Sequence, residues 1–262
     1  MKISQIIANS GLKTNIARKI LCEILNLSFE KLFLKDEISE SEFFEFSEIC
    51  NRYKNGEPLE YIFGHCEFLG RIFKVNPSVL IPRIETEILV QKSLEIARKF
   101  TNPVIFDICT GSGIIAISLA LAIENAKIFA SDISQDALSV AKQNAKNLSV
   151  KNIEFFKSDL LENLPPKADI IISNPPYIAN DYKLDRWVLA EPKIALFGGA
   201  KGDEILKRLI AQSSTRTQFL CCEMGYDQQT SLAKELESSG FKASFYKDLA
   251  GFDRGFVAQK LT

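Results

Sequence analysis

The spacing of apolar residues changes along the chain, from a helical period to the pattern of an α/β fold. Up to about residue 55, apolar residues recur every three or four positions, which predicts amphipathic helices. One such stretch opens with Ser39 and has Glu42 three places later, a pair that predicts a capping box at a helix start. This part of the chain is therefore expected to be a small helical domain with its own core.

Glycine and proline residues divide the next segment, 56–82, into short β-like runs. The runs GRIFKV and SVLI predict a hairpin or an extended linker between two domains. A helix with a broad apolar face is expected from Glu85 to about Phe100.

From Pro103 on, short apolar runs alternate with helical patterns. Seven runs have the composition of strands, namely VIFDIC, KIFASD, IEFFKSD, DIIISN, QFLCCEM, KASFYKD and GFVAQK. Continuous apolar strands separated by helices predict a parallel sheet covered on both faces, and the last two strands, with no helix between them, predict an antiparallel edge hairpin. The expected fold is α/β, with a doubly wound, mostly parallel seven-stranded sheet, a small N-terminal helical domain and a β-hairpin linker. The expected domain bounds are 1–67, 68–82 and 83–262.

The composition narrows the class of protein. The chain has 262 residues, 46% of them hydrophobic, and a net charge of -1, which argues against a generally basic nucleic-acid binder. No apolar run is long enough to span a bilayer, and polar residues interrupt the N-terminus, so we expect neither a membrane segment nor a secretory signal. The six cysteines form no Cys-x-x-Cys pair and His65 is the single histidine, so we expect reduced thiols, no metal site and a cytoplasmic protein.

Charge is unevenly distributed within the expected helical domain. Between Ser28 and Glu60, nine acidic residues stand against four basic ones, whereas the first 27 residues contain four basic residues and one acidic residue. An acidic surface repels phosphate backbones and suits a basic protein partner. An ordinary solvated face explains the same pattern about equally well.

The stretch DICTGSGIIA follows the first predicted strand of the sheet and opens a helix. Glycines permit a tight turn and let a ligand approach the backbone, and the helix N-terminus offers free N–H groups. The spacing Gly111-x-Gly113-x-x-Ala116 also fits a dinucleotide fingerprint. The next strand ends at Asp132, where a carboxylate can accept both hydroxyl hydrogens of a ribose. Because Ser134 is the better candidate for the helix cap, ribose binding is the favoured role of Asp132.

The third predicted strand ends in the sequence KSDLL. Asp159 stands where an adenine amino group could be met, and Leu160 could line the face of the ring, although Leu160 suits an ordinary core position as well. A nucleoside site made by three successive strand ends fits the crevice rule for open α/β sheets. Acidic strand ends, without arginine or lysine in CTGSGIIA, suit NAD or S-adenosylmethionine.

The fourth predicted strand ends in Asn174, followed by Pro175, Pro176 and Tyr177. Prolines lack an N–H group, so the corner presents carbonyl oxygens and the Asn174 side-chain oxygen with few competing donors. This acceptor cluster suits an NH2 group, and Tyr177 offers a flat face on which a planar group can stack. Two acceptors can hold a conjugated, weakly nucleophilic nitrogen for attack on an electron-poor methyl group. Asn-Pro is also ordinary turn chemistry, but a turn does not need all four residues at a strand end.

Longer stretches around these residues resemble a known family. The stretches are GEPLEYIFG, PSVLIPRIETE, DICTGSGIIAISLA, SDISQDALSVAKQNA, SNPPYI, EPKIALFGG and KDLAGFDRGFVAQK. They resemble the peptide chain release factor glutamine methyltransferase family (PrmC, formerly HemK), from about residue 50 to the end of the chain. The resemblance implies a Rossmann-like class I methyltransferase that methylates N5 of the glutamine in the Gly-Gly-Gln motif of class I release factors, in support of translation termination. S-adenosyl-L-methionine is the implied cofactor and S-adenosyl-L-homocysteine the product, and we expect a monomer that binds no nucleic acid directly and no membrane.

The matching motifs imply roles for individual residues. The implied catalytic and substrate-binding residues are Asn174, Pro175, Pro176 and Tyr177. The implied cofactor-binding residues are Cys109, Thr110, Gly111, Ser112, Gly113, Asp132, Asp159, Leu160 and Asn174. Three positions depart from the family pattern: Ile84 replaces a proline, Leu160 stands where some members have an aromatic residue, and Cys109 stands where many have glycine.

Four further positions outside the proposed site are expected to have mainly structural roles. Arg83 and Glu85, at the domain junction, are expected to brace the hairpin, with contact to the substrate as the alternative. Glu191-Pro192 is expected to shape the substrate channel. Glu223, at the end of a predicted strand, is expected to cap the next turn.

Two other functions use parts of the same pattern. A nucleic-acid amino methyltransferase acting on adenine or guanine would need the same corner, but the acidic helical domain and the near-neutral charge argue against it. A cofactor-binding scaffold that activates a partner subunit is disfavoured by the intact Asn-Pro-Pro-Tyr sequence. A protein without catalytic activity would not need to keep Asn174.

Overall fold

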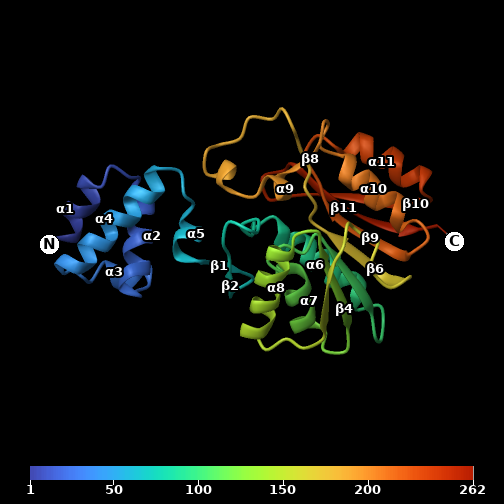
Figure 1. Cartoon of the computed structure of the whole chain (residues 1–262), viewed down its shortest axis with the longest axis horizontal. Helices are drawn as coiled ribbons and strands as arrows, with labels where there is room; N and C mark the ends of the chain where they lie inside the picture. The colour runs from blue at the N-terminus through green and yellow to red at the C-terminus, as the bar shows by residue number, and fades with distance from the viewer. Residues whose placement is uncertain (262) are drawn as a thin grey trace. The chain divides into compact units, whose positions relative to one another are not determined.

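The structure is a computed structural model that describes residues 1–261. The chain separates into two compact units (Figure 1). One contains Met1–Gly64 together with Asp185–Ala190, and the other contains His65–Leu184 and the residues from Glu191 on.

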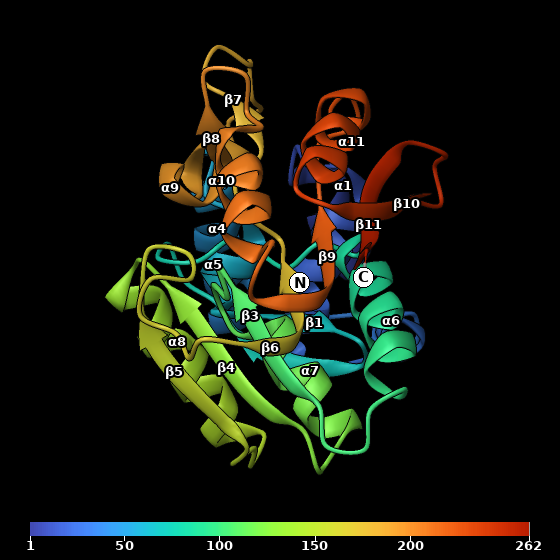
Figure 2. The same ribbon diagram turned by 90° about the vertical axis from the view of Figure 1, so that its right-hand side faces the viewer.

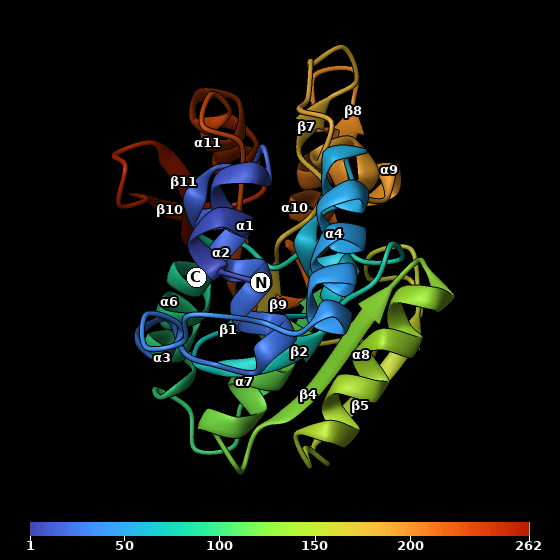
Figure 3. The ribbon, with the colours of Figure 1, turned by 90° about the vertical axis from the view of Figure 1, so that its left-hand side faces the viewer.

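The first unit is helical, as the apolar period predicted (Figure 3). Its helices are α1 (Ile3–Asn9), α2 (Thr14–Leu25), α3 (Phe29–Leu32), α4 (Glu40–Lys54) and α5 (Leu59–Phe63). The capping box at the start of α4 is confirmed: the Ser39 hydroxyl accepts from the Glu42 N–H, and the Glu42 carboxylate accepts from the Ser39 N–H. The apolar stripes of these helices pack around Ile20 and Leu21, which are fully buried.

Residues 185–190, which follow the Asn-Pro-Pro-Tyr corner in sequence, pack with the helices of the first unit. The Trp187 ring stacks on Tyr53, with ring centroids 5.3 Å apart. The Arg186 guanidinium donates to the carbonyl oxygen of Lys54 at 3.0 Å. A short 3-10 helix, η1 (Val188–Ala190), ends this segment.

The second unit begins with an antiparallel hairpin of β1 (His65–Phe68) and β2 (Arg71–Lys74). The prediction of a hairpin in this part of the chain is confirmed for GRIFKV. It is wrong for SVLI, because residues 78–81 form a turn and an irregular segment instead of a strand. The true partner strand precedes GRIFKV, across a two-residue turn in which Leu69 and Gly70 both have positive φ.

A seven-stranded sheet forms the centre of the second unit (Figure 2). Its strands are β3 (Val104–Ile108), β4 (Lys127–Asp132), β5 (Ile153–Lys157), β6 (Ala168–Ser173), β9 (Thr217–Glu223), β10 (Phe241–Lys247) and β11 (Asp253–Lys260). Their order is β10-β11-β9-β6-β3-β4-β5. The pairs from β9 to β5 are parallel, whereas β11 is antiparallel to β9 and to β10. The predicted doubly wound sheet with an antiparallel edge hairpin is thus confirmed.

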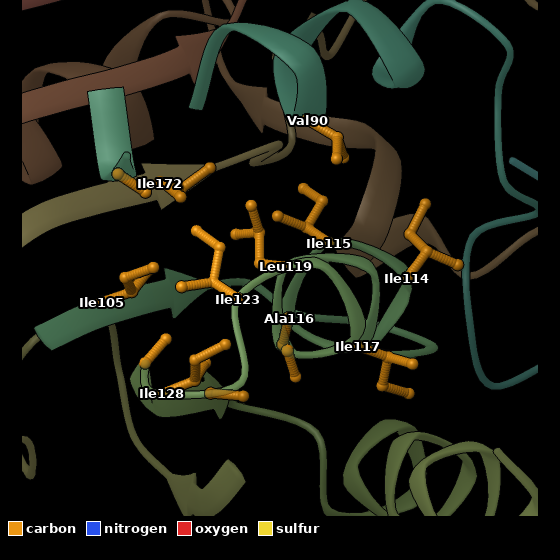
Figure 4. Packing of buried hydrophobic residues seen from close by; sticks show 14 of the residues in the cluster. Val90, Ile105, Ile114, Ile115, Ala116, Ile117, Leu119, Ile123, Ile128 and Ile172 are labelled. Atoms are coloured by element: carbon orange, nitrogen blue, oxygen red, sulfur yellow. The ribbon is translucent and has the colours of Figure 1, made fainter. Parts of the chain in front are cut away.

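Helices cover both faces of this sheet, and each face has its own core. The helices are α6 (Thr86–Ala97), α7 (Ile114–Ala122) and α8 (Gln135–Asn147) on one face, and α10 (Glu204–Ser213) and α11 (Gln229–Ser238) on the other. Ile115 and Leu119 of α7 pack against isoleucines of the sheet (Figure 4). Adjacent Cys221 and Cys222 of β9 belong to opposite cores, as strand geometry requires.

Short elements after β6 were not predicted from the pattern. They are β7 (Ile178–Ala179), β8 (Phe197–Gly199) and α9 (Lys193–Leu196), with β7 and β8 pairing as a small parallel ribbon. The six cysteines are thiols. No helix within residues 1–261 combines the length and the apolar character needed to cross a membrane.

Candidate active site

The strand order reverses direction between β3 and β6, so a crevice opens at their carboxyl ends. The chain runs outward from β3 through β4 to β5, then returns to β6 on the other side of β3. The Ser173 hydroxyl at the end of β6 donates to the carbonyl oxygen of Ile108 at 2.7 Å and ties the two strand ends together. The glycine turn after β3 and the Asn-Pro-Pro-Tyr corner after β6 therefore start from adjacent positions.

A cavity of about 190 Å³ lies at this edge of the sheet. Its wall comes from the carboxyl ends of β3, β4, β5 and β6, from the start of α7, from the segment before α6, and from α9 and α10. The sequence-predicted residues in this wall are Cys109, Thr110, Gly111, Ser112, Asp132, Asp159, Leu160, Asn174 and Pro176. Residues drawn from four strand ends thus meet around one space.

The glycine turn is shaped by Asp107, a fully buried carboxylate at the end of β3. Its Oδ2 accepts from the Thr110 hydroxyl at 2.6 Å and from the Ala116 N–H at 3.0 Å, so it joins the turn to the first residues of α7. Its Oδ1 is buried and has no hydrogen-bond partner in the described part of the chain. Burial raises the pKa of Asp107 to about 7, although the two hydrogen bonds oppose this shift.

The backbone of the turn has positive φ at both predicted glycines and at Cys109, where φ is 58°. A cysteine is rare in this left-handed region, where glycine would carry no steric penalty. Gly113 begins α7 with φ at 84°, and a Cβ there would lie 3.1 Å from Cβ of Ala141 in α8. Gly113 therefore permits close helix packing rather than lining the cavity. Burial, followed by the charges of nearby carboxylates, strongly raises the pKa of the Cys109 thiol, which stays protonated.

Asp132 ends β4 and organises two backbone segments. Its Oδ2 accepts from the Gly111 N–H and its Oδ1 from the Ser134 N–H, both at 2.9 Å. Burial raises its pKa, and these backbone hydrogen bonds partly offset the effect. Ser134 caps α8 through its own hydroxyl, which accepts from the Ala137 N–H, so the predicted cap is confirmed. A carboxylate oxygen has more than one acceptor direction, which leaves Asp132 able to accept further hydrogen bonds.

Asp159 and Leu160 follow β5. The Arg208 guanidinium of α10 donates to Asp159 Oδ2 at 2.7 Å, and Arg208 also lines the cavity. Leu160 is buried, with φ at 49°. Sequence reasoning missed Arg208, because α10 follows β6 and reaches this strand end only through the fold.

The donors and acceptors of the cavity fit an adenosyl cofactor without a pyrophosphate. The N–H groups of Thr110, Gly111 and Gly113, which would cradle phosphates in a dinucleotide site, donate instead to Ser131, Asp132 and Thr110. Two carboxylates at the ends of β4 and β5, with an apolar wall between them, suit a ribose and an adenine. S-adenosylmethionine fits this set better than NAD.

The Asn-Pro-Pro-Tyr corner has a half-buried Asn174 and two buried prolines. The carbonyl oxygen of Tyr177 accepts from Gln228 Nε2 at 2.8 Å, and Gly198 packs directly against the Pro176 carbonyl, where a Cβ would lie at 2.5 Å. The Tyr177 carbonyl is thus used within the fold, and the Pro176 carbonyl is closely covered by Gly198. The Asn174 side-chain oxygen and the Pro175 carbonyl accept no hydrogen bond from the described residues and are two acceptors that the corner still offers.

Behind this corner lies a buried carboxylate, Glu223, at the end of β9. The Tyr177 hydroxyl donates to its Oε1 at 2.9 Å, and the Thr86 hydroxyl donates to its Oε2 at 2.8 Å. Thr86 in turn accepts from Asn174 Nδ2 at 3.1 Å. The expectation that Glu223 caps the next turn is wrong, because both of its oxygens face hydroxyl groups of the site.

Arg83 and Glu191 brace the wall of the cavity. The expectation that Arg83 braces the hairpin is wrong, because its hydrogen-bond partners are Glu191 and Ile81, both outside β1 and β2. The Arg83 guanidinium donates to the Glu191 carboxylate and to the Ile81 carbonyl oxygen, and the Ile81 N–H donates to Glu191. Glu191 is almost fully buried in this pair. Ile84, which departs from the family pattern, is 68% exposed, so the irregular segment tolerates it. No cluster of three or more potential metal ligands occurs within residues 1–261.

Two family models match the chain. One, described as "PrmC N-terminal domain", matches residues 3–64, and the other, described as "Methyltransferase small domain", matches residues 84–191. Among curated relatives, a protein of Aquifex aeolicus is 36% identical over 93% of this chain and 90% of its own length. A protein of Koribacter versatilis is 39% identical over 86% and 83%, and one of Lactococcus lactis 38% identical over 89% and 88%. Each is described as "Release factor glutamine methyltransferase".

Solved structures share the fold at lower identity. A ribosomal protein L11 methylase from Lactobacillus delbrueckii matches with a TM-score of 0.53 and 24% identity over 71% of this chain and 84% of its own. A methyltransferase from Pyrococcus furiosus matches with a TM-score of 0.54 and 14% identity over 81% and 98%. At this identity the likeness supports the fold alone.

Proposed function

The chain belongs to the release factor glutamine methyltransferase family, and we propose that it methylates a glutamine side chain of class I peptide chain release factors. The methyl group comes from S-adenosylmethionine, and the acceptor is N5 of the glutamine in the Gly-Gly-Gln motif. One observation carries the proposal: Asn174 and Pro176 of the acceptor corner line the same cavity as Asp132 and Asp159. An amide held at the corner would therefore lie beside the cofactor.

In the cofactor half of the cavity, each strand end contacts a different part of S-adenosylmethionine. Asp132 accepts from the ribose hydroxyls, Asp159 meets the adenine amino group, and Leu160 lies against the ring. Cys109, Thr110, Gly111 and Ser112 border the methionine part, and Gly113 shapes the turn beneath them. When bound, S-adenosylmethionine supplies an electron-poor methyl group, and S-adenosyl-L-homocysteine is the product.

The substrate half of the cavity holds and orients an amide. The amide nitrogen of glutamine is a poor nucleophile because its lone pair is delocalised. The Asn174 side-chain oxygen and the Pro175 carbonyl accept its two hydrogens and favour the geometry needed for attack. Pro176 fixes the backbone of the corner, and Tyr177 offers its ring to the planar group. The nitrogen loses its proton after methylation, when it has become more acidic, so no general base is needed before transfer. The protonated thiol of Cys109 is a weak nucleophile and does not compete for the methyl group.

The two units have separate proposed tasks. We assign substrate recognition to residues 1–67, a linker to 68–82 and methyl transfer to 83–262. Exposed aromatic side chains support recognition by the helical part: Phe29, Phe33 and Phe44 are 42%, 63% and 67% exposed. The proposal also includes a monomeric protein that acts in the cytoplasm. It does not contact nucleic acid or a membrane directly.

A labelling experiment tests the proposed substrate. The protein is incubated with labelled S-adenosylmethionine and purified release factors, DNA or RNA. We expect label on a release factor, and we expect it to vanish when the Gly-Gly-Gln glutamine is replaced. Label on nucleic acid alone would refute the proposal and favour an adenine or guanine amino methyltransferase.

A matched pair of variants tests the corner. Asn174→Ala removes the amide acceptor, so we expect turnover to fall by about 100-fold or more while cofactor affinity changes little. Asn180→Ala replaces an exposed asparagine of the same segment and should keep wild-type activity. Cofactor affinity is measured by calorimetry and turnover by the labelling assay; retained turnover in Asn174→Ala would contradict the acceptor role.

A further inference from the structure

A line of hydrogen bonds leads from Asn174 through Thr86, which also lines the cavity, to the buried Glu223. Asn174 Nδ2 donates to Thr86 Oγ1 at 3.1 Å, and Thr86 Oγ1 donates to Glu223 Oε2 at 2.8 Å. Thr86 is 0% exposed and Glu223 is 1% exposed, so water does not compete for these groups. Thr86 is the first residue of α6, and Glu223 is the last residue of β9.

The count of protons along this line decides which way the Asn174 amide faces. An ionised carboxylate only accepts hydrogen bonds, and a hydroxyl group has a single hydrogen to donate. Because Thr86 gives its hydrogen to Glu223, its oxygen can only accept from Asn174. The nitrogen of the Asn174 amide must then face Thr86. Its oxygen accepts no hydrogen bond from residues 1–261 and is left for a ligand in the cavity.

We propose that Thr86 and Glu223 are positioning residues, which hold the Asn174 amide with its oxygen presented to the substrate nitrogen. This inference rests on the proposed function, because it is the glutamine amide that needs an acceptor there. A reversed Asn174 amide would present an NH2 group to the substrate NH2 group, and the two donors would repel each other. Asparagine alone does not choose between the two orientations; the acceptor chemistry of the corner is therefore set by a carboxylate two hydrogen bonds away.

Glu223 holds the other end of the corner as well. Its second oxygen accepts from the Tyr177 hydroxyl at 2.9 Å. One buried carboxylate thus fixes Asn174 through Thr86 and fixes Tyr177 directly. The side chains at both ends of the Asn-Pro-Pro-Tyr corner are therefore fixed by the same residue. Glu223 lies 46 residues beyond Tyr177 in the chain.

Protonation of Glu223 would release this arrangement. The charged and titratable groups around it are Tyr177, Arg254, Glu85 and Tyr246. Burial raises the pKa of Glu223, while the Thr86 and Tyr177 hydrogen bonds and the charge of Arg254 lower it. Once protonated, Glu223 can donate to Thr86, whose hydroxyl is then free to donate to the Asn174 oxygen. Turnover that depends on the amide orientation is therefore lost as pH falls through the pKa of Glu223.

Kinetics of Thr86 variants test the role. Thr86→Val keeps the side-chain shape but leaves the Asn174 nitrogen without an acceptor, so we expect kcat to fall about tenfold or more. The affinity for S-adenosylmethionine should change by less than about threefold, because the residues that meet the cofactor are intact. Thr86→Ser restores the hydroxyl and should recover most of the activity. Ser93→Ala removes another buried hydroxyl from the same helix and should behave as the wild type.

The pH dependence of kcat distinguishes the positioning role from a simple loss of packing at Thr86. In the wild type and in Thr86→Ser, we expect an acid limb in kcat from Glu223. In Thr86→Val that limb should be weaker than in the wild type, because Glu223 then acts on the corner through Tyr177 alone. Circular dichroism confirms that each variant is folded.

Nuclear magnetic resonance of the Asn174 side-chain amide tests the orientation without relying on activity. Its signal in the ¹⁵N-labelled protein is assigned by its absence in Asn174→Ala. We expect slow hydrogen exchange in the wild type and fast exchange in Thr86→Val. Exchange that is equally fast in both, wild-type kcat in Thr86→Val, or no rescue by Thr86→Ser would overturn the inference. If the wild type methylates no release factor but its amide is protected, the proposed substrate fails while the positioning role stands.

Discussion

Asp107 provides a direct test of how burial acts on a charged group beneath the glycine turn. Its carboxylate is fully buried, both of its hydrogen bonds go to Oδ2, and burial raises its pKa from 3.8 to about 7. Asp107→Asn keeps an acceptor for Thr110 and Ala116 but has no charge to desolvate. The variant therefore isolates the contribution of ionisation to stability.

The sign follows from the direction of the pKa shift. A carboxyl group with a raised pKa in the folded state binds its proton more tightly there than in the unfolded chain. Its stabilising contribution is complete below about pH 3.8 and is lost as pH rises through about 7. A difference between 3.8 and about 7 corresponds to ~4 kcal/mol. The free energy of unfolding of the wild type, measured relative to Asp107→Asn, should therefore fall by about 4 kcal/mol between pH 4 and pH 8.

Urea unfolding followed by circular dichroism at several pH values measures this difference. Other titrating groups are common to both proteins and cancel in the comparison. Asp136→Asn, which removes an exposed carboxylate from the first turn of α8, is the matched control. A difference between wild type and Asp107→Asn that changes by less than about 1 kcal/mol over this range would refute the reasoning. It would mean that the Thr110 and Ala116 hydrogen bonds offset the burial of the charge.

Two further predictions concern residues that hold or line the cofactor half of the cavity. Asn144→Ala removes hydrogen bonds to the N–H and carbonyl of Lys74 and to the carbonyl of Ser112, so urea unfolding should show a loss of about 3 kcal/mol. Asp132→Ala removes the proposed ribose acceptor and frees the glycine turn, so calorimetry should show a dissociation constant for S-adenosylmethionine raised about tenfold or more. Asp136→Ala should leave that constant unchanged, and equal constants for Asp132→Ala and wild type would exclude the ribose role.

The fold was predictable where the information is local. Continuous apolar runs separated by amphipathic periods define the parallel strands and their helices, and the Ser39–Glu42 pair defines its own cap within four residues. The elements that were missed, such as β7 and α9, have two to four residues, too few to produce a period. SVLI has the composition of a strand, but the pairing position beside β2 is taken by β1, and composition does not reveal which run pairs.

The candidate site was predictable as far as each residue stands at a strand end. Asp132, Asp159 and Asn174 were placed by the rule that ligands bind at the carboxyl ends of parallel strands, and all three line one cavity. Polar residues within apolar patterns were a poorly used signal: Asp107 in VIFDIC was passed over, and Glu223 at the end of β9 was given only a capping role. Such a residue must have a buried partner, but the sequence does not say which one.

The partners of Asn174 show why that step needs the structure. Thr86 lies 88 residues before Asn174, and Glu223 lies 137 residues after Thr86. No periodicity or composition in the sequence indicates these contacts. They exist because α6 and β9 pack together in the fold. The Asn-Pro-Pro-Tyr sequence supplies a rigid corner and an amide, and both are local properties. The direction in which that amide faces is a property of the fold, so the same four residues without a buried acceptor chain behind them would not make an equally selective acceptor.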